Sequence, residues 1–373
     1  MKAKLPVRRA ILERRTYEPP AEGRWNKVRL DFNENTAGCA PAVRRALAKL
    51  TPKHFAMYPE YEVSTKTLAK HFGVRPEELL LTNGGDDALR VFFDAFVDSK
   101  SRILLSEPTF PMYRYYAEIC GARIDNLRYG AQMEFPTEQA IRTLKERPRV
   151  FFIANPNNPT GTLLGYAELE KIVKAATHTA VVIDEAYVEF SGLTVVPWIK
   201  KYPHLFVTRT FSKAMGLAAL RLGAVIANMD SLAILRRAMP PFPVNLAALV
   251  AAEAAVRDTK TRQAYVRNIL RVRSWFQGEL NSLGITTYPS AGNFVLVNFG
   301  PAGPALVQRL GQKGILVRER SKEMGSGFVR ITIGTEREMR SVAREIRRGW
   351  RKAQTYQQRY RGRSNAPYSK SPS

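Results

Sequence analysis

The sequence is poor in the residues that build disulfide frameworks and metal sites. It has only two cysteines, Cys39 and Cys120, with no CxxC pair, and its four histidines are scattered without metal-ligand spacing. These absences argue against a disulfide-stabilised fold, a zinc site and a histidine-based triad. We therefore expect no metal and a location in the reducing cytoplasm.

The sequence also lacks a long apolar run. No stretch approaches the roughly 20 apolar residues that a membrane-spanning helix needs. The basic N-terminus, MKAKLPVRRAILERR, has no apolar core segment or small-residue cleavage site of a secretory signal. We expect neither a membrane span nor a secretory signal in a chain long enough for two packed domains.

Acidic residues are few relative to basic ones. The chain has 33 Asp and Glu against 58 Lys and Arg, a formal net charge of +25. Such a charge attracts nucleic acids or anionic substrates. The basic residues are spread along the chain, as in the pairs Arg8-Arg9 and Arg44-Arg45, and no DNA-binding motif accompanies them. This spread favours a solvated basic surface and small-molecule partners over a nucleic acid.

The stretch TRTFSKAMGLAALRLG, residues 208–223, carries a chemical signal. A short apolar run before it predicts a buried strand, and a hydroxyl-rich loop with one lysine, Lys213, follows. A buried lysine loses its proton readily, which suits a Schiff-base amine. The Thr210 and Ser212 hydroxyls and the Arg221 guanidinium suit one phosphate. Together they indicate pyridoxal phosphate (PLP), whereas the ordinary alternative is a solvated loop with a surface lysine.

Apolar strands and helical stretches alternate through much of the chain. RVFFIA at 149–154 and AVVIDEAY at 180–187 are typical of buried strands, and the glycines and acids that open 84–97 are typical of a helix start. This alternation predicts an α/β domain on a mainly parallel sheet, whose ligands bind beyond the carboxyl ends of the strands. We expect Asp184 and Lys213 to meet there.

Other residues at the predicted strand ends suit the rest of PLP. Asp184 can hold a proton on the pyridine nitrogen, and Phe110 can stack on the ring. Asn157 and Tyr187 can donate hydrogen bonds to the phenolic oxygen. Each residue also has an ordinary role, as a helix cap, a core aromatic or a turn residue. Their coincidence at one sheet edge favours a cofactor site.

The sequence predicts two domains and a tail. Residues 1–50 form an N-terminal arm and part of a small domain, and 51–244 form the large PLP-binding domain. Residues 245–352 complete a small α+β domain, with expected strands at 293–299, 314–320 and 328–334. The basic stretch 353–373 lacks an apolar pattern, which predicts disorder.

A series of motifs resembles fold-type I PLP-dependent aminotransferases, and most closely the histidinol-phosphate aminotransferase family. The motifs are LDFNEN, YPEY, NGGDDAL, EPTFPMY, NPNNPTG, VVIDEAY, RTFSKAMGLAALRLG and VRITIGT, in the family's order between about Tyr17 and Arg348. The resemblance implies a PLP enzyme of histidine biosynthesis. It would convert L-histidinol phosphate and 2-oxoglutarate to imidazole acetol phosphate and glutamate.

The resemblance also implies roles for individual residues. Lys213 matches the lysine that carries the cofactor, with Asp184 and Tyr187 as further catalytic residues. The other cofactor contacts are Gly85, Asp86, Phe110, Asn157, Thr210, Ser212 and Arg221. Tyr58 would reach the cofactor phosphate of a partner subunit. The substrate contacts are Tyr17, Asn35, Arg318 and Arg330. A site shared in this way implies a homodimer.

The sequence departs from the family pattern in places. Thr36 stands where many relatives carry proline, Asp87 replaces a glutamate, and Phe110 stands where some relatives have tyrosine. None of these removes a catalytic function. An aromatic amino-acid aminotransferase and a threonine-phosphate decarboxylase share the cofactor site and stay open as alternatives. The non-enzymatic alternative is a basic nucleic-acid-binding protein on this fold.

Overall fold

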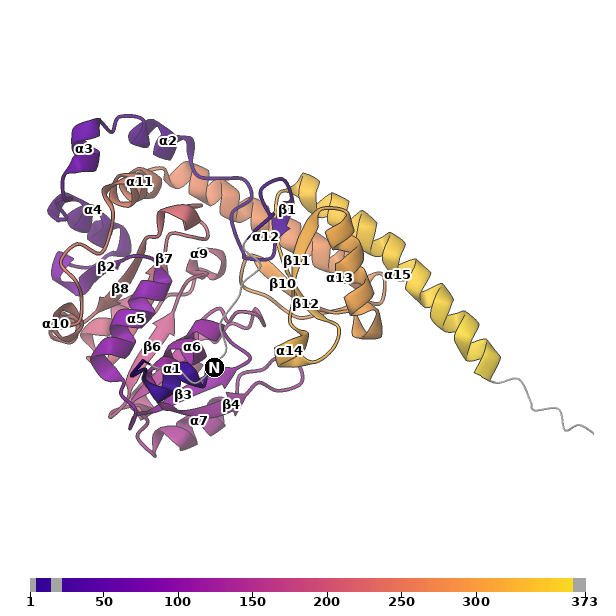
Figure 1. The fold of residues 1–373 in the computed structure, drawn as a ribbon, viewed down its shortest axis with the longest axis horizontal. Coiled ribbons are helices and arrows are strands. Elements are labelled where there is room, and N and C mark those ends of the chain that lie inside the picture. The colour runs from indigo at the N-terminus through magenta and orange to yellow at the C-terminus, as the bar shows by residue number, and fades with distance from the viewer. Residues whose placement is uncertain (1–4, 15–21, 365–373) are drawn as a thin grey trace, which may run out of the picture.

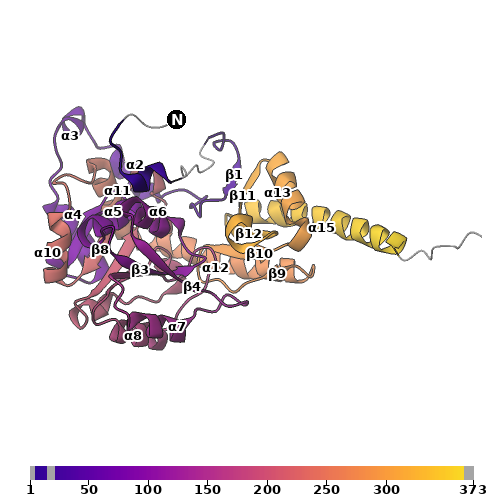
Figure 2. The same ribbon diagram turned by 60° about the horizontal axis from the view of Figure 1, so that its bottom comes forward.

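The structure is a computed structural model that describes residues 5–14 and 22–364, with side chains described as far as 352. Figure 1 shows a large α/β unit beside a smaller unit, from which helix α15 projects. Figure 2 shows the same projection from a second direction.

A seven-stranded sheet forms the centre of the large unit. Its strand order is β2-β8-β7-β6-β5-β3-β4. Strands β7, β6, β5, β3 and β4 pair in parallel, whereas β8 is antiparallel to both of its neighbours, which confirms the mainly parallel sheet. The bounds are β2 Leu79–Thr82, β3 Arg102–Glu107, β4 Arg123–Arg128, β5 Val150–Ala154, β6 Ala180–Asp184, β7 Leu205–Thr210 and β8 Gly223–Ala227.

The central strands are apolar on both faces because helices cover both faces. In β5, Phe151 belongs to one core cluster and Phe152 to the other, since successive side chains of a strand point to opposite faces. Helices α5 Gly85–Phe96, α6 Pro111–Cys120 and α10 Met229–Arg237 pack on the Phe152 side. The Phe151 side is covered by α2 Pro41–Leu47, α4 Glu62–Phe72, α7 Thr137–Leu144, α8 Tyr166–Ala175 and α11 Leu246–Arg257.

A five-stranded sheet of order β1-β11-β12-β10-β9 forms the small unit. Strand β1 pairs in parallel with β11, so the N-terminal part of the chain joins this sheet, and the remaining pairs are antiparallel. The strands are β1 Val28–Leu30, β9 Thr286–Thr287, β10 Phe294–Asn298, β11 Ile315–Glu319 and β12 Phe328–Thr332. The helices that accompany them are α12 Thr259–Asn281, α13 Gly303–Gln312, α14 Ser321–Met324 and α15 Glu336–Ser364. Helices α1 Arg9–Leu12 and α3 Pro52–Ala56 lie on the large unit, and the short α9 Val188–Ser191 packs on α12 from the large unit (Figure 1).

The structure differs from the expected domain boundaries at two places, residues 244 and 352. Helix α11 follows residue 244, yet Leu249 and Ala252 on it are buried in the large core, where α11 packs on α2 and α4. The helices of the small unit therefore begin at α12, and α11 belongs to the large unit. The predicted tail also differs, because α15 continues through 353 to Ser364. Ala, Gln and Arg favour a helix without any apolar pattern to reveal it.

No helix among the described residues has both the length and the apolar character to cross a bilayer.

Candidate active site

A cavity of about 340 Å³ lies between the two units, beyond the carboxyl ends of β5, β6 and β7. Phe32 and the arginines of β11 and β12 line it from the small unit, and strand-end residues line it from the large unit. The cavity brings together most of the predicted site residues: Gly85, Asp86, Phe110, Asp184, Tyr187, Thr210, Ser212, Lys213, Arg221, Arg318 and Arg330.

Lys213 extends into this cavity from the loop after β7. Its Nζ donates a hydrogen bond of 2.9 Å to the backbone oxygen of Phe32. Burial, aided by the nearby Arg330 guanidinium, lowers the pKa of Lys213 to about 8. A lysine with such a pKa is partly neutral near physiological pH, and a neutral amine is a nucleophile.

Asp184 is the last residue of β6, and two neutral donors hold its carboxylate. Oδ1 accepts the backbone N–H of Ala186 at 3.0 Å, and Oδ2 accepts the Tyr113 hydroxyl at 2.7 Å. Burial raises the pKa of Asp184, and these donors oppose that rise. The carboxylate is thus fixed in orientation while it faces the cavity.

The N-terminus of α5 and Arg221 form a polar corner of the cavity. Gly84 is left-handed (φ +84°), and a Cβ there would lie 2.6 Å from a guanidinium nitrogen of Arg221, so only glycine allows this approach. Arg221 donates to Asp86 Oδ2 at 3.1 Å, and Ser212 lies on the facing loop. Backbone N–H groups at a helix start, a hydroxyl and a guanidinium are the donors that bind phosphate.

Arg318 and Arg330 line the cavity from neighbouring strands of the small sheet. Arg330 is buried and donates to Asn158 Oδ1 and to the backbone oxygen of Asp31. Burial lowers the pKa of Arg330 to about 10, so its guanidinium stays charged at neutral pH. Its Nε has no hydrogen-bond partner among the described residues. Arg320, which the sequence analysis did not select, is buried and lines the same wall.

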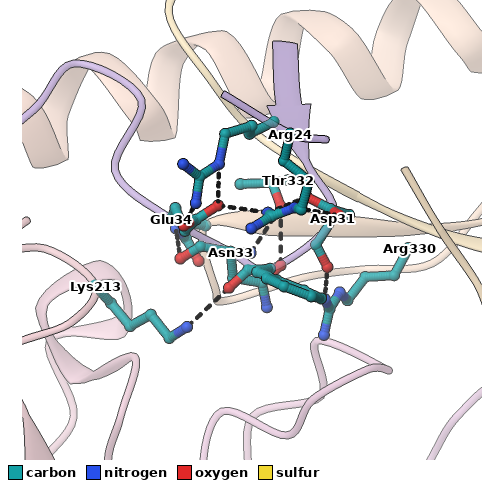
Figure 3. Close-up of polar contacts among 10 residues, drawn as sticks. Arg24, Asp31, Asn33, Glu34, Lys213, Arg330 and Thr332 are labelled. Carbon is teal, nitrogen blue, oxygen red and sulfur yellow. Dashed lines mark hydrogen bonds and ion pairs between the residues drawn. The ribbon is translucent and has the colours of Figure 1, made fainter. Parts of the chain in front are cut away.

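The segment after β1, residues 31–35, connects these groups (Figure 3). Asn33 has a left-handed backbone (φ 55°), and its Nδ2 donates to the Tyr187 hydroxyl at 2.8 Å. Arg24 bonds the carboxylates of Asp31 and Glu34 at 2.7 and 2.8 Å, and the Asn33 backbone N–H donates to Thr332 Oγ1 of β12 at 3.0 Å, which holds the segment against the small sheet. Because Lys213 and Arg330 bond backbone oxygens of the same segment, it aligns groups from both units.

The structure places Asn158, rather than the predicted Asn157, in the cavity. Asn157 is fully buried, and its amide bonds Thr109, Thr160 and a backbone oxygen. Asn158 lines the cavity and contacts Arg330. The two neighbouring asparagines point in different directions within one turn, which the composition of NPNNPTG does not reveal.

Two other predicted residues, Asn35 and Tyr58, do not line the cavity. Asn35 does not line the cavity, and its Nδ2 donates to the backbone oxygen of Ala214 at 3.3 Å. Tyr58 is 79% exposed and stacks on Phe242, with 4.5 Å between ring centroids. Tyr17 lies outside the described residues.

Sequence reasoning did not select Phe32, Glu34 or Tyr113. Phe32 and Glu34 lie in LDFNEN, a motif recognised as a whole, yet only the fold shows that they line the cavity. Tyr113 follows Phe110 by one helical turn in EPTFPMY. The spacing of three residues was the available signal, since it places both rings on one side of a helix.

The chain is similar to known proteins in sequence and in fold. Residues 26–346 match the family described as Aminotransferase class I and II. A histidinol-phosphate aminotransferase of Geobacillus sp. (strain WCH70) is 35% identical over 83% of this chain and 86% of its own length. Another, from Carboxydothermus hydrogenoformans, is 32% identical over 90% of this chain and 96% of its own. The chain belongs to the class I and II aminotransferases.

A solved structure shares the fold over nearly the whole chain. It is the histidinol-phosphate aminotransferase of Sinorhizobium meliloti in complex with pyridoxal-5'-phosphate, with a TM-score of 0.87 and 24% identity. The match covers 94% of this chain and 99% of that one. It supports the prediction of a fold-type I architecture from the sequence motifs.

The residues of the cavity also fit PLP. A Cβ added to Gly85 would meet nothing within 4 Å, so there is open space at the first residue of α5. A partly buried lysine with a lowered pKa and an oriented, partly buried carboxylate lie at the same cavity. An amine, a carboxylate and a set of phosphate donors are the three groups that this cofactor needs.

Proposed function

We propose that the chain is a PLP-dependent aminotransferase that transfers the amino group of L-histidinol phosphate to 2-oxoglutarate, giving imidazole acetol phosphate and glutamate. The observation that carries this proposal is the wall of Arg318, Arg320 and Arg330 on the cavity that holds Lys213. A phosphate monoester carries nearly two negative charges at neutral pH, and a carboxylate carries one. A wall with several guanidiniums suits both anions.

Four groups of residues would hold the cofactor. Ser212, Arg221 and the first backbone amides of α5 would bind its phosphate. Asn158 and Tyr187 would donate to its phenolic oxygen, and Phe110 would lie against its ring. When bound, PLP supplies an electron sink that stabilises the carbanion formed at Cα of the amino substrate. Asp184 would hold a proton on the pyridine nitrogen, which strengthens that sink.

The chain's own residues would bind the substrate and move its proton. Arg330 would anchor the carboxylate of glutamate or the phosphate of histidinol phosphate, since its buried Nε has no partner among the described residues. Arg318 would contact the second charge of the phosphate. Lys213, whose amine is partly neutral near pH 8, would take the proton from Cα and deliver it to the cofactor carbon that is bonded to the substrate's nitrogen.

We also propose that the enzyme is a cytoplasmic homodimer with shared active sites. Tyr58 and its neighbours Phe55 and Met57 are 79%, 70% and 61% exposed, and Tyr58 stacks on half-exposed Phe242. Contiguous exposed aromatic and apolar residues are typical of protein interfaces. The free cysteines Cys39 and Cys120 suit a reducing compartment.

A panel of amino donors tests the substrate. The purified protein, loaded with PLP, is offered histidinol phosphate, phenylalanine and threonine phosphate with 2-oxoglutarate as acceptor. We expect the largest kcat/KM for histidinol phosphate. A larger value for phenylalanine would make the enzyme an aromatic aminotransferase, and loss of carbon dioxide from threonine phosphate would make it a decarboxylase.

Sedimentation and mixing test the dimer. Tyr58→Phe and Lys213→Ala should each impair activity on its own. Because each site would take Lys213 from one subunit and Tyr58 from the other, a mixed dimer of the two variants would contain one site without either change. Partial recovery of activity on mixing is expected. A monomer in sedimentation, or no recovery from stable mixed dimers, would refute the shared site.

A further inference from the structure

Tyr113 lies behind Asp184 as seen from the cavity. It is fully buried in the first turn of α6, one turn after Phe110. Its ring stacks on Phe152 of β5, with centroids 5.2 Å apart and planes 14° apart, and it meets the Phe110 ring edge-on at 5.7 Å. Two aromatic neighbours therefore hold the phenol in one orientation.

The Tyr113 hydroxyl donates to Asp184 Oδ2 at 2.7 Å. A buried phenol needs a hydrogen-bond partner, so the contact satisfies Tyr113 as well as the carboxylate. Burial raises the pKa of Tyr113 well above its ordinary value, so the phenol keeps its proton and remains a donor throughout the working pH range. Phenylalanine at this position would fill the same space and leave Asp184 without this donor.

The electrostatic setting of the pair makes that donor important. Burial raises the pKa of Asp184, which favours its neutral form, and the Tyr113 hydroxyl is the main opposing group. The other titratable groups that act on the two residues are Asp86 on α5, Tyr187 before α9 and Tyr129 after β4. Asp86 disfavours the carboxylate anion, and Tyr187 and Tyr129 disfavour a phenolate at Tyr113. Tyr187 and Tyr129 thus keep the proton on the Tyr113 phenol, and Asp86 increases the need of the Asp184 carboxylate for a hydrogen-bond donor.

We propose that Tyr113 is a positioning residue that keeps Asp184 ionised and aims it at the cofactor's pyridine nitrogen. The inference rests on the proposed binding of PLP. A proton shared between the ring nitrogen and Asp184 has two positions, on nitrogen beside a carboxylate or on the carboxyl beside a neutral ring. Donation from Tyr113 stabilises the carboxylate, so it favours the proton on nitrogen.

The test replaces the hydroxyl alone. Tyr113→Phe keeps the ring, and Tyr116→Phe is the matched control, because Tyr116 lies on the same helix, is half-buried and does not line the cavity. Both variants and the parent are loaded with PLP labelled with ¹⁵N in the ring, and the ¹⁵N chemical shift is recorded at neutral pH. Loss of one hydrogen bond to a charged group corresponds to a change of about tenfold or more in the proton's distribution.

We expect the ring nitrogen to be protonated in the parent and in Tyr116→Phe, and to shift towards the neutral value in Tyr113→Phe. An unchanged shift in Tyr113→Phe would overturn the proposal and leave Tyr113 as a packing residue. A shift that also appears in Tyr116→Phe would overturn it as well, because it would reflect general loosening of α6.

A second measurement separates this inference from the proposed function. The full chain without cofactor, labelled with ¹³C at aspartate carboxyls, is titrated by NMR, with Asp184→Asn identifying the resonance. The Asp184 carboxyl should titrate about 1 to 2 pH units higher in Tyr113→Phe than in the parent. Failure of the parent to bind PLP would refute the proposed function and the aim at the pyridine nitrogen, but not the coupling between Tyr113 and Asp184. Equal titration in both proteins would refute that coupling. If Tyr113→Phe does not fold, 3-fluorotyrosine at position 113, a stronger donor, should lower the titration, and an unchanged titration would refute the coupling.

Discussion

Arg318 and Arg330 are cross-strand partners in the small sheet, on antiparallel strands β11 and β12. Directly opposed residues of a pair of strands have their side chains on the same face, and here both guanidiniums line the cavity. Two like charges held side by side repel each other unless an anion lies between them. The cross-strand pair therefore suits the anion-binding role that we propose for it, in the cavity that Lys213 also lines.

The two arginines are expected to affect the two substrates differently. Arg318→Leu should raise KM for histidinol phosphate more than KM for glutamate. The difference should correspond to a loss of about 1.5–3 kcal/mol of binding free energy, as is usual for a hydrogen bond to a charged group. Arg330→Leu should impair both half-reactions, because this residue would be the shared anchor. Steady-state kinetics with each substrate give the comparison. Arg337→Leu, at an exposed position of α15, is the control, and equal effects of Arg318→Leu on both substrates would contradict the assignment.

Asp184→Asn should leave PLP bound and slow the reaction. The amide keeps the size of the side chain but loses the charge that would hold a proton on the ring. Removal of a preorganised charge raises barriers by about 3–4 kcal/mol, so turnover should fall by two to three orders of magnitude. Single-turnover absorbance changes with glutamate measure this step. Near-normal turnover with bound PLP would make Asp184 a structural residue.

The amine of Lys213 should make the free energy of unfolding of the protein without cofactor depend on pH. Its folded pKa of about 8 lies below the ordinary 10.5, so the folded state binds fewer protons than the unfolded state between these values. Stability from this group therefore rises with pH from about 8 to 10.5, and below that window the buried charge is destabilising. Lys213→Met should unfold at a higher temperature than the parent at pH 7.

Unfolding temperatures measured over a series of pH values test this prediction. The difference in unfolding temperature between Lys213→Met and the parent should shrink as the pH rises from about 8 to 10.5. The exposed Lys49→Met is the control and should show little difference at any pH. A difference that stays constant across the series would mean that the Lys213 amine is not perturbed in the folded protein.

Removal of the chain after residue 352 should preserve activity. The part of α15 that packs on the small unit lies before this point, at Met339, Val342 and Ile346, and Trp350 donates to the Leu283 backbone oxygen at 2.9 Å. Turnover at saturating substrate should match that of the full chain. A loss of turnover would contradict this view. Binding of a DNA duplex at physiological salt by the full chain alone would instead support the nucleic-acid alternative.

The residues at the sheet edge were predictable because a simple rule governs them. A buried parallel strand brings the polar residues at its end to the carboxyl edge of the sheet, where Asp184 ends β6 and Lys213 lies in the loop after β7. The choice between Asn157 and Asn158 was not predictable in this way. Their chemistry is the same, and the backbone angles of one turn decide which amide faces the cavity.

Contacts between distant parts of the chain were the least visible from the sequence. The bond of Asn33 to Tyr187 joins positions 154 residues apart, and no local pattern indicates it. Helix α11 is apolar around most of its surface, so its periodicity did not reveal whether it packs on the large or the small unit. Tyr113 stands among aromatic core residues, and only its 2.7 Å contact with Asp184 distinguishes it from them.

Lys213, as the residue that would carry the cofactor, is the residue on which the proposed function depends most. The purified protein incubated with PLP is reduced with borohydride, digested and mapped by mass spectrometry, with Lys213→Ala treated in parallel. We predict one phosphopyridoxyl group on the peptide that contains Lys213, near-visible absorbance before reduction, and neither signal in the variant. A label on another lysine, or an unchanged label in Lys213→Ala, would contradict the assignment of Lys213 as the residue that binds the cofactor.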